Sequence, residues 1–166
     1  MDIASTPEAA PTITPTIRRE DYRVPDWLVP EVALDFALGI EETRVVSRFA
    51  VRRNAEGSGS QTIRLLGDGI AAQSVRVDGE AINDWRMDGP DLLIDLSGDA
   101  HEIEVETLIQ PAANTQLMGL YASNGMLCTQ CEAEGFRWIT FSPDRPDVLS
   151  TYRVRMEGDR EAFPVL

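Results

Sequence analysis

Short runs in which apolar and polar residues alternate constrain the fold of this chain more than any other feature. Because successive side chains of a strand point to opposite faces, each run predicts a strand with one buried face. The runs lie at residues 32–38, 44–51, 63–65, 75–77, 92–96, 103–107 and 152–156. Turn signals separate most of them at intervals of about ten residues, a spacing typical of an all-β sandwich or antiparallel sheet.

Two local signals refine this all-β prediction. Asp78-Gly79 lies between short β-runs and predicts a tight hairpin, because both central positions of such a turn need positive φ. No long window carries a helical stripe with caps, so we expect at most short helical turns. The best candidate is residues 144–149, with Asp144 as the N-cap and Pro146 in the first turn.

The 166 residues suit a single domain of ordinary size. Residues 1–20 are rich in Pro, Thr and Ala and predict a flexible leader, which leaves residues 21–166 as the domain. The chain ends on the apolar residues 163–166. Because domains usually end on polar residues, we expect this chain to be the front part of a longer polypeptide.

The formal net charge of −13 argues against nucleic acid as a partner, because phosphate binding needs a basic face. It argues equally against an anionic membrane surface. No apolar run approaches the roughly 18 residues of a membrane helix, and the N-terminus has no secretory signal pattern. We therefore expect a cytoplasmic protein.

A single histidine, His101, limits the chemistry further. A metal site built from two or three histidines is impossible within the chain, so zinc hydrolase chemistry is excluded unless another segment supplies the ligands. His101 precedes the apolar positions of residues 103–107, and we expect it to be a surface residue of that strand.

Residues 111–149 differ from the rest, and we interpret them as a long, irregular and functional connection. Cys128-x-x-Cys131 is half of a zinc site, a redox pair, or two reduced thiols that position a loop. Glu132 and Glu134 point the same way if that stretch is extended. They are either an acid/base or ammonium-binding pair, or simply part of an acidic loop paired with Arg137 and Arg145.

Four stretches of this region together resemble the N-terminal domain of the bacterial aminopeptidase N family of zinc metallopeptidases. The similarity runs from about Asp21 to Leu166 and is most specific over the ten residues from Cys128 to Arg137. The stretches are Gln110-Pro111-Ala112-Ala113-Asn114-Thr115, Gly119-Leu120-Tyr121, Cys128-Thr129-Gln130-Cys131-Glu132-Ala133-Glu134-Gly135-Phe136-Arg137 and Asp144-Arg145-Pro146-Asp147-Val148-Leu149.

The resemblance implies a saddle-shaped β domain that precedes a catalytic domain of the same polypeptide. The zinc ligands of the family lie in the catalytic domain, so it implies no catalytic residue and no metal in this chain, and no activity for the chain alone. It assigns Gln130 and Glu132 to binding the free α-amino group of a peptide substrate. Glu134 keeps a structural role, paired with an arginine.

The leading hypothesis is therefore the substrate-anchoring domain of a monomeric zinc aminopeptidase, whose partners are peptide N-termini and its own catalytic domain. The alternative is an independent β-sandwich that binds a peptide or protein through an exposed strand edge. A cysteine-pair redox protein is a third reading.

Overall fold

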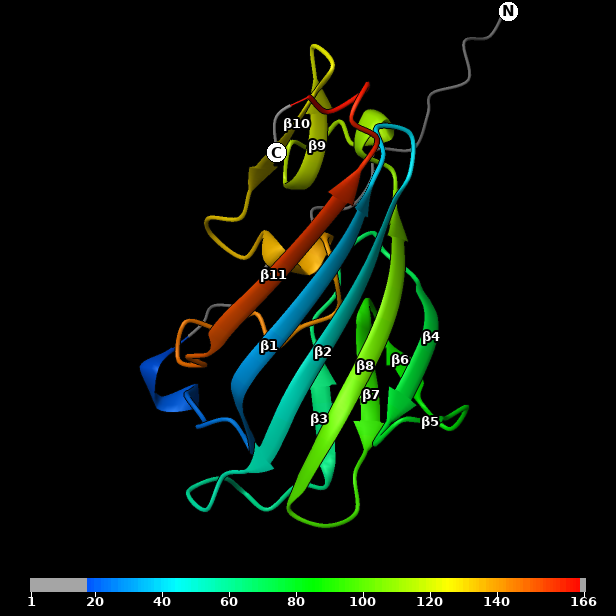
Figure 1. Ribbon diagram of the computed structural model, residues 1–166. Helices are drawn as coiled ribbons and strands as arrows, with labels where there is room; N and C mark the ends of the chain where they lie inside the picture. Colours follow the sequence, from blue (N-terminus) through cyan, green and yellow to red (C-terminus); the bar gives the residue numbers. More distant parts are fainter. Residues whose placement is uncertain (1–17, 165–166) are drawn as a thin grey trace, which may run out of the picture.

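The computed structural model describes residues 18–164, which form eleven strands and three short 3₁₀ turns (Figure 1). Six strands build a large sheet in the spatial order β11, β1, β2, β8, β4, β5. Their bounds are β1 Trp27–Leu38, β2 Thr43–Arg53, β4 Ala72–Val77, β5 Glu80–Ala81, β8 Ala100–Ile109 and β11 Thr151–Gly158. The others are β3 Thr62–Leu65, β6 Arg86–Asp88, β7 Asp91–Asp95, β9 Gly119–Ser123, β10 Met126–Gln130, η1 Arg19–Asp21, η2 Pro111–Ala113 and η3 Phe136–Trp138.

The predicted all-β fold is confirmed, and every predicted strand is present. The large sheet is antiparallel, as predicted, except at one place where β11 lies parallel to β1, with Glu31 beside Thr151. Parallel neighbours need a long connection, and residues 39–150 separate β1 from β11. The predicted leader falls mostly on residues 1–17, outside the described range.

The main core lies between the large sheet and a three-stranded sheet of order β3, β7, β6. The inward positions of the alternating runs supply it, as periodicity requires. The large sheet contributes Val32, Leu34, Phe49, Val51, Val75, Ile103 and Val105, and the small sheet contributes Ile63, Leu65, Leu92 and Ile94. A second cluster joins one end of the large sheet to the β9–β10 hairpin through Val45, Ile109, Leu120 and Ile139.

Two turns show how local chemistry sets the hairpins. The predicted Asp78-Gly79 turn joins β4 to β5 with φ values of 52° and 83°, which confirms it. Asn124 and Gly125 have φ values of 50° and 78° and join β9 to β10 in the same way. Residues 111–149 are therefore only partly the irregular connection expected from the sequence, since they contain a regular hairpin before the irregular residues 131–149.

The predicted helical turn at residues 144–149 is also wrong. This stretch makes one hydrogen-bonded turn, in which the Val148 amide donates to the Arg145 carbonyl. Asp144 caps no helix, because its carboxylate accepts hydrogen bonds from the backbone and side chain of Arg137. That contact fixes the carboxylate away from the amides that an N-cap would serve.

The expectation that His101 lies on the surface is wrong. It is a residue of β8, but its side chain is only 11% exposed and lies 6.1 Å from the Trp27 ring, centroid to centroid. Its Nδ1 atom lies 2.7 Å from a carboxylate oxygen of Asp78 in the β4–β5 turn. The other oxygen of Asp78 accepts from the Glu102 amide, so this carboxylate fastens the turn to β8.

This contact predicts a pH-dependent stability. The hydrogen bonds from His101 and the Glu102 amide hold the pKa of Asp78 below its ordinary value of 3.8. The stabilisation is present above the unfolded-state pKa and is lost as pH falls through the lower folded-state value. Asp78→Asn tolerates the left-handed backbone, removes the charge and replaces one acceptor oxygen by an NH₂ group. In urea unfolding, the stability gap between the native chain and Asp78→Asn should narrow below about pH 4. A gap that stays constant down to about pH 3 contradicts this account.

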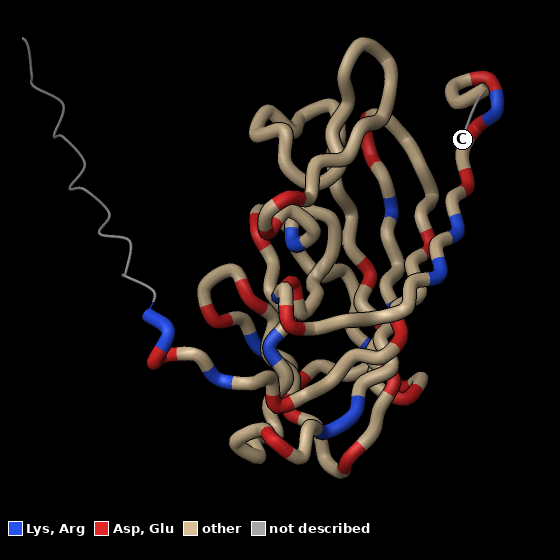
Figure 2. The backbone as a smooth tube through the Cα atoms, turned by 90° about the vertical axis from the view of Figure 1, so that its left-hand side faces the viewer, with Lys and Arg blue, Asp and Glu red and all other residues tan. Residues whose placement is uncertain are grey.

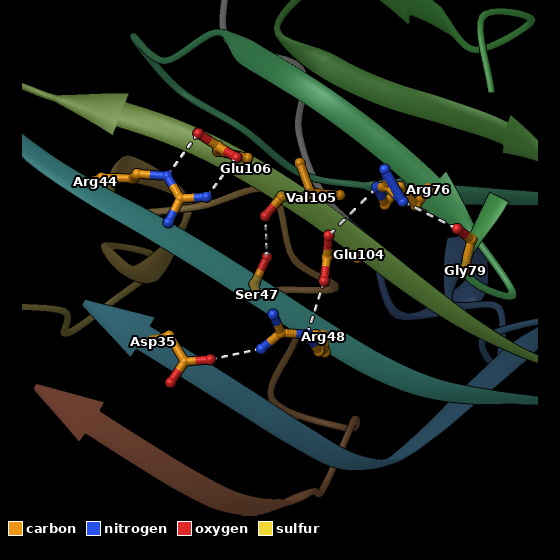
Figure 3. Close-up of polar contacts among 9 residues, drawn as sticks. All are labelled: Asp35, Arg44, Ser47, Arg48, Arg76, Gly79, Glu104, Val105 and Glu106. Carbon is orange, nitrogen blue, oxygen red and sulfur yellow. Dashed lines mark hydrogen bonds and ion pairs between the residues drawn. The ribbon is translucent and has the colours of Figure 1, made fainter. Parts of the chain in front are cut away.

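The outer face of the large sheet carries ion pairs that cross from strand to strand (Figure 3). Arg44 binds Glu106 through two hydrogen bonds of 2.7 Å, and Arg48 bridges Asp35 on β1 to Glu104 on β8. All fifteen cationic side chains of the sequence are arginine, whose planar group suits such paired contacts.

Acidic residues are spread over strands and loops (Figure 2). No helix within residues 18–164 is long and apolar enough to cross a membrane.

Candidate functional site

The β9–β10 hairpin carries the first of the predicted site residues at its end. β10 finishes at Gln130, opposite Gly119 of β9, and the chain then turns through residues 131–135 into η3. The Gly135 amide donates to the Cys131 carbonyl at 2.9 Å, which closes this turn. The Glu132–Ala133 peptide bond in the turn is cis.

Gly135 allows the turn to pack closely against the end of β10. A Cβ atom at this position would lie 2.6 Å from the Gln130 carbonyl oxygen and 2.7 Å from the Cys131 Cα atom. Real Cβ atoms essentially never approach backbone atoms so closely, so any side chain here must displace the segment from Gln130 to Glu132. The glycine therefore sets the position of that segment.

Buried hydroxyl groups fasten the segment that follows η3 to the centre of the large sheet. Thr107 on β8 donates to the Ile139 carbonyl at 3.0 Å, and the hydroxyls of Ser47 and Thr140 lie 2.8 Å apart. All three side chains are fully buried. The Ser47 hydroxyl also lies 3.2 Å from the Val105 carbonyl, to which it can donate. These contacts satisfy buried polar groups and hold the sheet and the site segment together. A small hydroxyl residue at an inward strand position is the sequence signal for such a contact.

Gln130 and Glu132, the two residues predicted to bind a substrate, lie together at the surface. The Gln130 side-chain amide donates from Nε2 to the Glu132 backbone carbonyl at 2.8 Å. Its own oxygen stays available as an acceptor. The Glu132 carboxylate is exposed and has no hydrogen bond or ion pair with any residue in the described part of the chain. The pair thus presents two acceptor groups, one of them charged.

Glu134 has a different environment from Glu132, although both are exposed. Its carboxylate lies 3.5 Å from the guanidinium of Arg137, which agrees with the structural role expected for it. Arg137 also binds Asp144. Its Nε atom lies 3.0 Å from the Asp144 carboxylate, and another guanidinium nitrogen donates a hydrogen bond to the Asp144 carbonyl. Arg145 does not join this cluster and pairs with Asp147 instead.

The two cysteines are free thiols, and both are partly buried. Burial raises the pKa of the Cys131 thiol, with a smaller contribution from the negative charge of Asp144. A redox-active cysteine needs the opposite shift, because the thiolate is the reactive form. Within residues 18–164, no three side chains of His, Cys, Asp or Glu gather in a way that would hold a metal ion. The thiols therefore fit the loop-positioning reading.

Comparison with known proteins finds matches to one family of domains. The model of the Peptidase M1 N-terminal domain matches residues 72–165, more than half of the chain. Aminopeptidase N of Haemophilus influenzae is 42% identical over 153 residues, and that of Caulobacter vibrioides is 42% identical over 158 residues. These matches cover 89% and 93% of this chain, but 17% and 18% of the relatives.

Solved structures agree with the fold. Legionella pneumophila aminopeptidase A in complex with aspartic acid superposes with a TM-score of 0.81 at 27% identity, over 88% of this chain and 18% of that one. A mutant M1 zinc metallopeptidase from Deinococcus radiodurans, bound to a Tyr-Ser-Ala substrate, gives a TM-score of 0.66 at 16% identity. That match covers 80% of this chain and 33% of that one. The chain thus spans less than a fifth of its curated relatives, and it belongs to the Peptidase M1 N-terminal domain family.

Proposed function

We propose that this chain is the N-terminal domain of a zinc-dependent aminopeptidase and that Gln130 and Glu132 anchor the α-ammonium group of the peptide substrate. The observation that carries the proposal is the Glu132 carboxylate, which is unpaired within the described residues and sits on a turn held by Gly135. Aminopeptidase relatives match the whole of this region. In this proposal the domain covers residues 21–166 and is inactive without the rest of the polypeptide.

The chemistry follows from the charges. A peptide N-terminus is an ammonium group with three N–H donors, and it pairs best with a carboxylate in a cleft from which water is partly excluded. The Gln130 oxygen accepts a second hydrogen bond, because the amide nitrogen is already bound to the Glu132 carbonyl. An internal peptide bond has no ammonium neighbour, so this anchor restricts cleavage to the first residue of a peptide.

The proposed zinc site lies in the rest of the polypeptide and not in this chain. Within the described residues no cluster of metal ligands exists, and the single histidine of the chain is bound to Asp78. The metal, which would activate water and polarise the scissile carbonyl when bound, must take its ligands from another domain. This chain contributes by holding the substrate in the correct position relative to the metal centre.

Matched substrates test the proposed anchor in the whole polypeptide that the gene encodes. We expect hydrolysis of leucine p-nitroanilide and a loss of at least about 100-fold in kcat/KM for the N-acetylated form, which has no ammonium group. A chelator should abolish the activity, and added zinc should restore it. Equal cleavage of the free and acetylated substrates would show that no ammonium anchor operates. A gene product without any peptidase activity favours the independent binding module instead.

A further inference from the structure

The outer face of the large sheet holds a groove that the proposed function does not use. Its volume is about 620 Å³, and residues of β11, β1, β2 and β8 line it, whereas Gln130 and Glu132 do not. Two small residues, Ala33 on β1 and Ala50 on β2, lie in it among longer charged side chains. Both alanines point outward, because the residues on either side of each belong to the buried core. They therefore form a low floor on an otherwise crowded face.

Two arginines flank Ala33 across the sheet. The strand register places Arg153 of β11 on one side of Ala33 and Arg48 of β2 on the other. Arg153 is exposed, and its guanidinium has no hydrogen bond or ion pair to any residue of the described range 18–164. Arg48 binds Asp35 through Nη1 and Glu104 through Nε, which leaves the donors of Nη2 unused among these residues (Figure 3). An anionic group above Ala33 can therefore accept hydrogen bonds from both sides.

Two glutamates flank Ala50 in the same manner. The register places Glu31 of β1 on one side of Ala50 and Glu102 of β8 on the other. Both side chains are exposed, and neither carboxylate is paired in the part of the chain that the structure describes. Two strand spacings separate their Cα atoms, about 10 Å, with only the Ala50 methyl group between them. A cationic group above Ala50 is therefore attracted from both sides.

We propose that this groove binds a short peptide with two free termini, with its carboxylate between the arginines and its ammonium group between the glutamates. The two flanked alanines lie in neighbouring rows of outward side chains, which are two residues or about 7 Å apart along the strands. The charged ends of an extended dipeptide are also about 7 Å apart, because its backbone has the same rise per residue. A single amino acid is too short to reach both rows.

Other ligand classes fit the groove less well. A phosphate group would be repelled by Glu31 and Glu102, and a metal ion would be repelled by the arginines. No three metal-ligating side chains gather anywhere within residues 18–164. The inference goes beyond the proposed function and does not depend on it, because every residue of the groove lies in this chain. Under that function, short peptides are what remains of a substrate after repeated cleavage.

Titration with L-alanyl-L-alanine tests the proposal in the 166-residue chain with isotope-labelled alanine methyl groups. Since Ala33 and Ala50 form the floor, we expect both methyl signals to shift together and to saturate, with a millimolar Kd because the ion pairs are exposed. Free alanine should bind about 3- to 5-fold more weakly, since it lacks one of the ion pairs. The N-acetylated dipeptide amide, which has no charges, should cause no shift. If the chain does not fold alone, the whole polypeptide treated with a chelator takes its place.

Three variants separate the groove from the general charge of the surface. Arg153→Gln and Glu102→Gln remove one charge from opposite ends of the site, and each should weaken binding about 3- to 5-fold. Arg86→Gln makes the same change of charge on β6 of the other sheet and should leave the Kd unchanged. The inference is overturned if neither methyl signal shifts at tens of millimolar dipeptide. Equal binding of alanine or of the uncharged amide, or equal weakening by Arg86→Gln, overturns it as well. None of these results bears on the anchor proposed at Glu132.

Discussion

Replacing Glu132 by alanine in the whole enzyme should lower kcat/KM for aminoacyl substrates by on the order of 10²–10³, with zinc content unchanged. Removing one member of a buried ion pair costs about 3–5 kcal/mol, which corresponds to this range of transition-state stabilisation. The carboxylate is exposed in the chain by itself, so its burial requires the substrate and the cleft that we propose it forms with the rest of the polypeptide. The effect therefore belongs to binding and catalysis, and the stability of the domain should not change.

Glu134→Ala is the matched control, because Glu134 is two residues away, equally acidic and equally exposed. Its ion pair with Arg137 is a surface contact, worth at most about 1 kcal/mol. We expect near-normal kcat/KM for this variant in a steady-state assay with leucine p-nitroanilide. Glu132→Gln should keep part of the activity, since an amide oxygen still accepts hydrogen bonds without carrying charge. Equal losses in Glu132→Ala and Glu134→Ala contradict the assignment.

The largest effect on folding should come from Phe141→Ala. Phe141 is fully buried in the main core, although it lies in the connection that follows η3. Its ring packs against the Gly67 backbone, where even a Cβ atom would lie only 2.4 Å from ring atom Cε1. The neighbouring residues Leu66 and Ser142 exchange two backbone hydrogen bonds beside it. Truncation leaves a cavity that these constraints prevent from collapsing, so we expect a loss of about 3–5 kcal/mol.

Urea unfolding of the 166-residue chain measures this loss. Tyr22→Ala is the control, because Tyr22 is an aromatic residue that is 55% exposed and makes one hydrogen bond, to Asp147. We expect it to cost less than about 1 kcal/mol. If Phe141→Ala costs no more than the control, the connection after η3 is not part of the cooperative core. In that case the site segment would unfold independently of the sheets.

The strands could be predicted from the sequence because their signal is local. The inward residues within the predicted runs of β1, β2 and β8 follow from alternation, although a register shift between Leu28 and Glu31 sets the start of β1 apart. The Asp78-Gly79 hairpin follows from the φ values that its turn requires. The parallel placement of β11 could not be predicted in this way. It depends on where a long connection returns the chain, and no residue of β11 encodes its neighbour.

The candidate site residues follow from the resemblance to a family and not from a physical pattern, and their role remains a prediction. Gln130 and Glu132 carry no periodic signal, and their mutual contact arises from a turn that Gly135 permits. The Asn124-Gly125 turn did carry a local signal for the β9–β10 hairpin, but the unusual composition around it indicated an irregular loop instead. His101 was misplaced because a polar residue near a strand end gives no local sign of the tryptophan it covers.

The hydroxyl contacts of Thr107, Ser47 and Thr140 have a consequence for motion. They join the segment after η3 to two central strands of the large sheet, so the site turn and the sheet move as one rigid body. We therefore do not expect the Gln130–Glu132 turn to act as a flexible lid. Under the proposed function, we expect a cleft around a substrate to narrow by movement of this domain as a whole relative to the rest of the polypeptide.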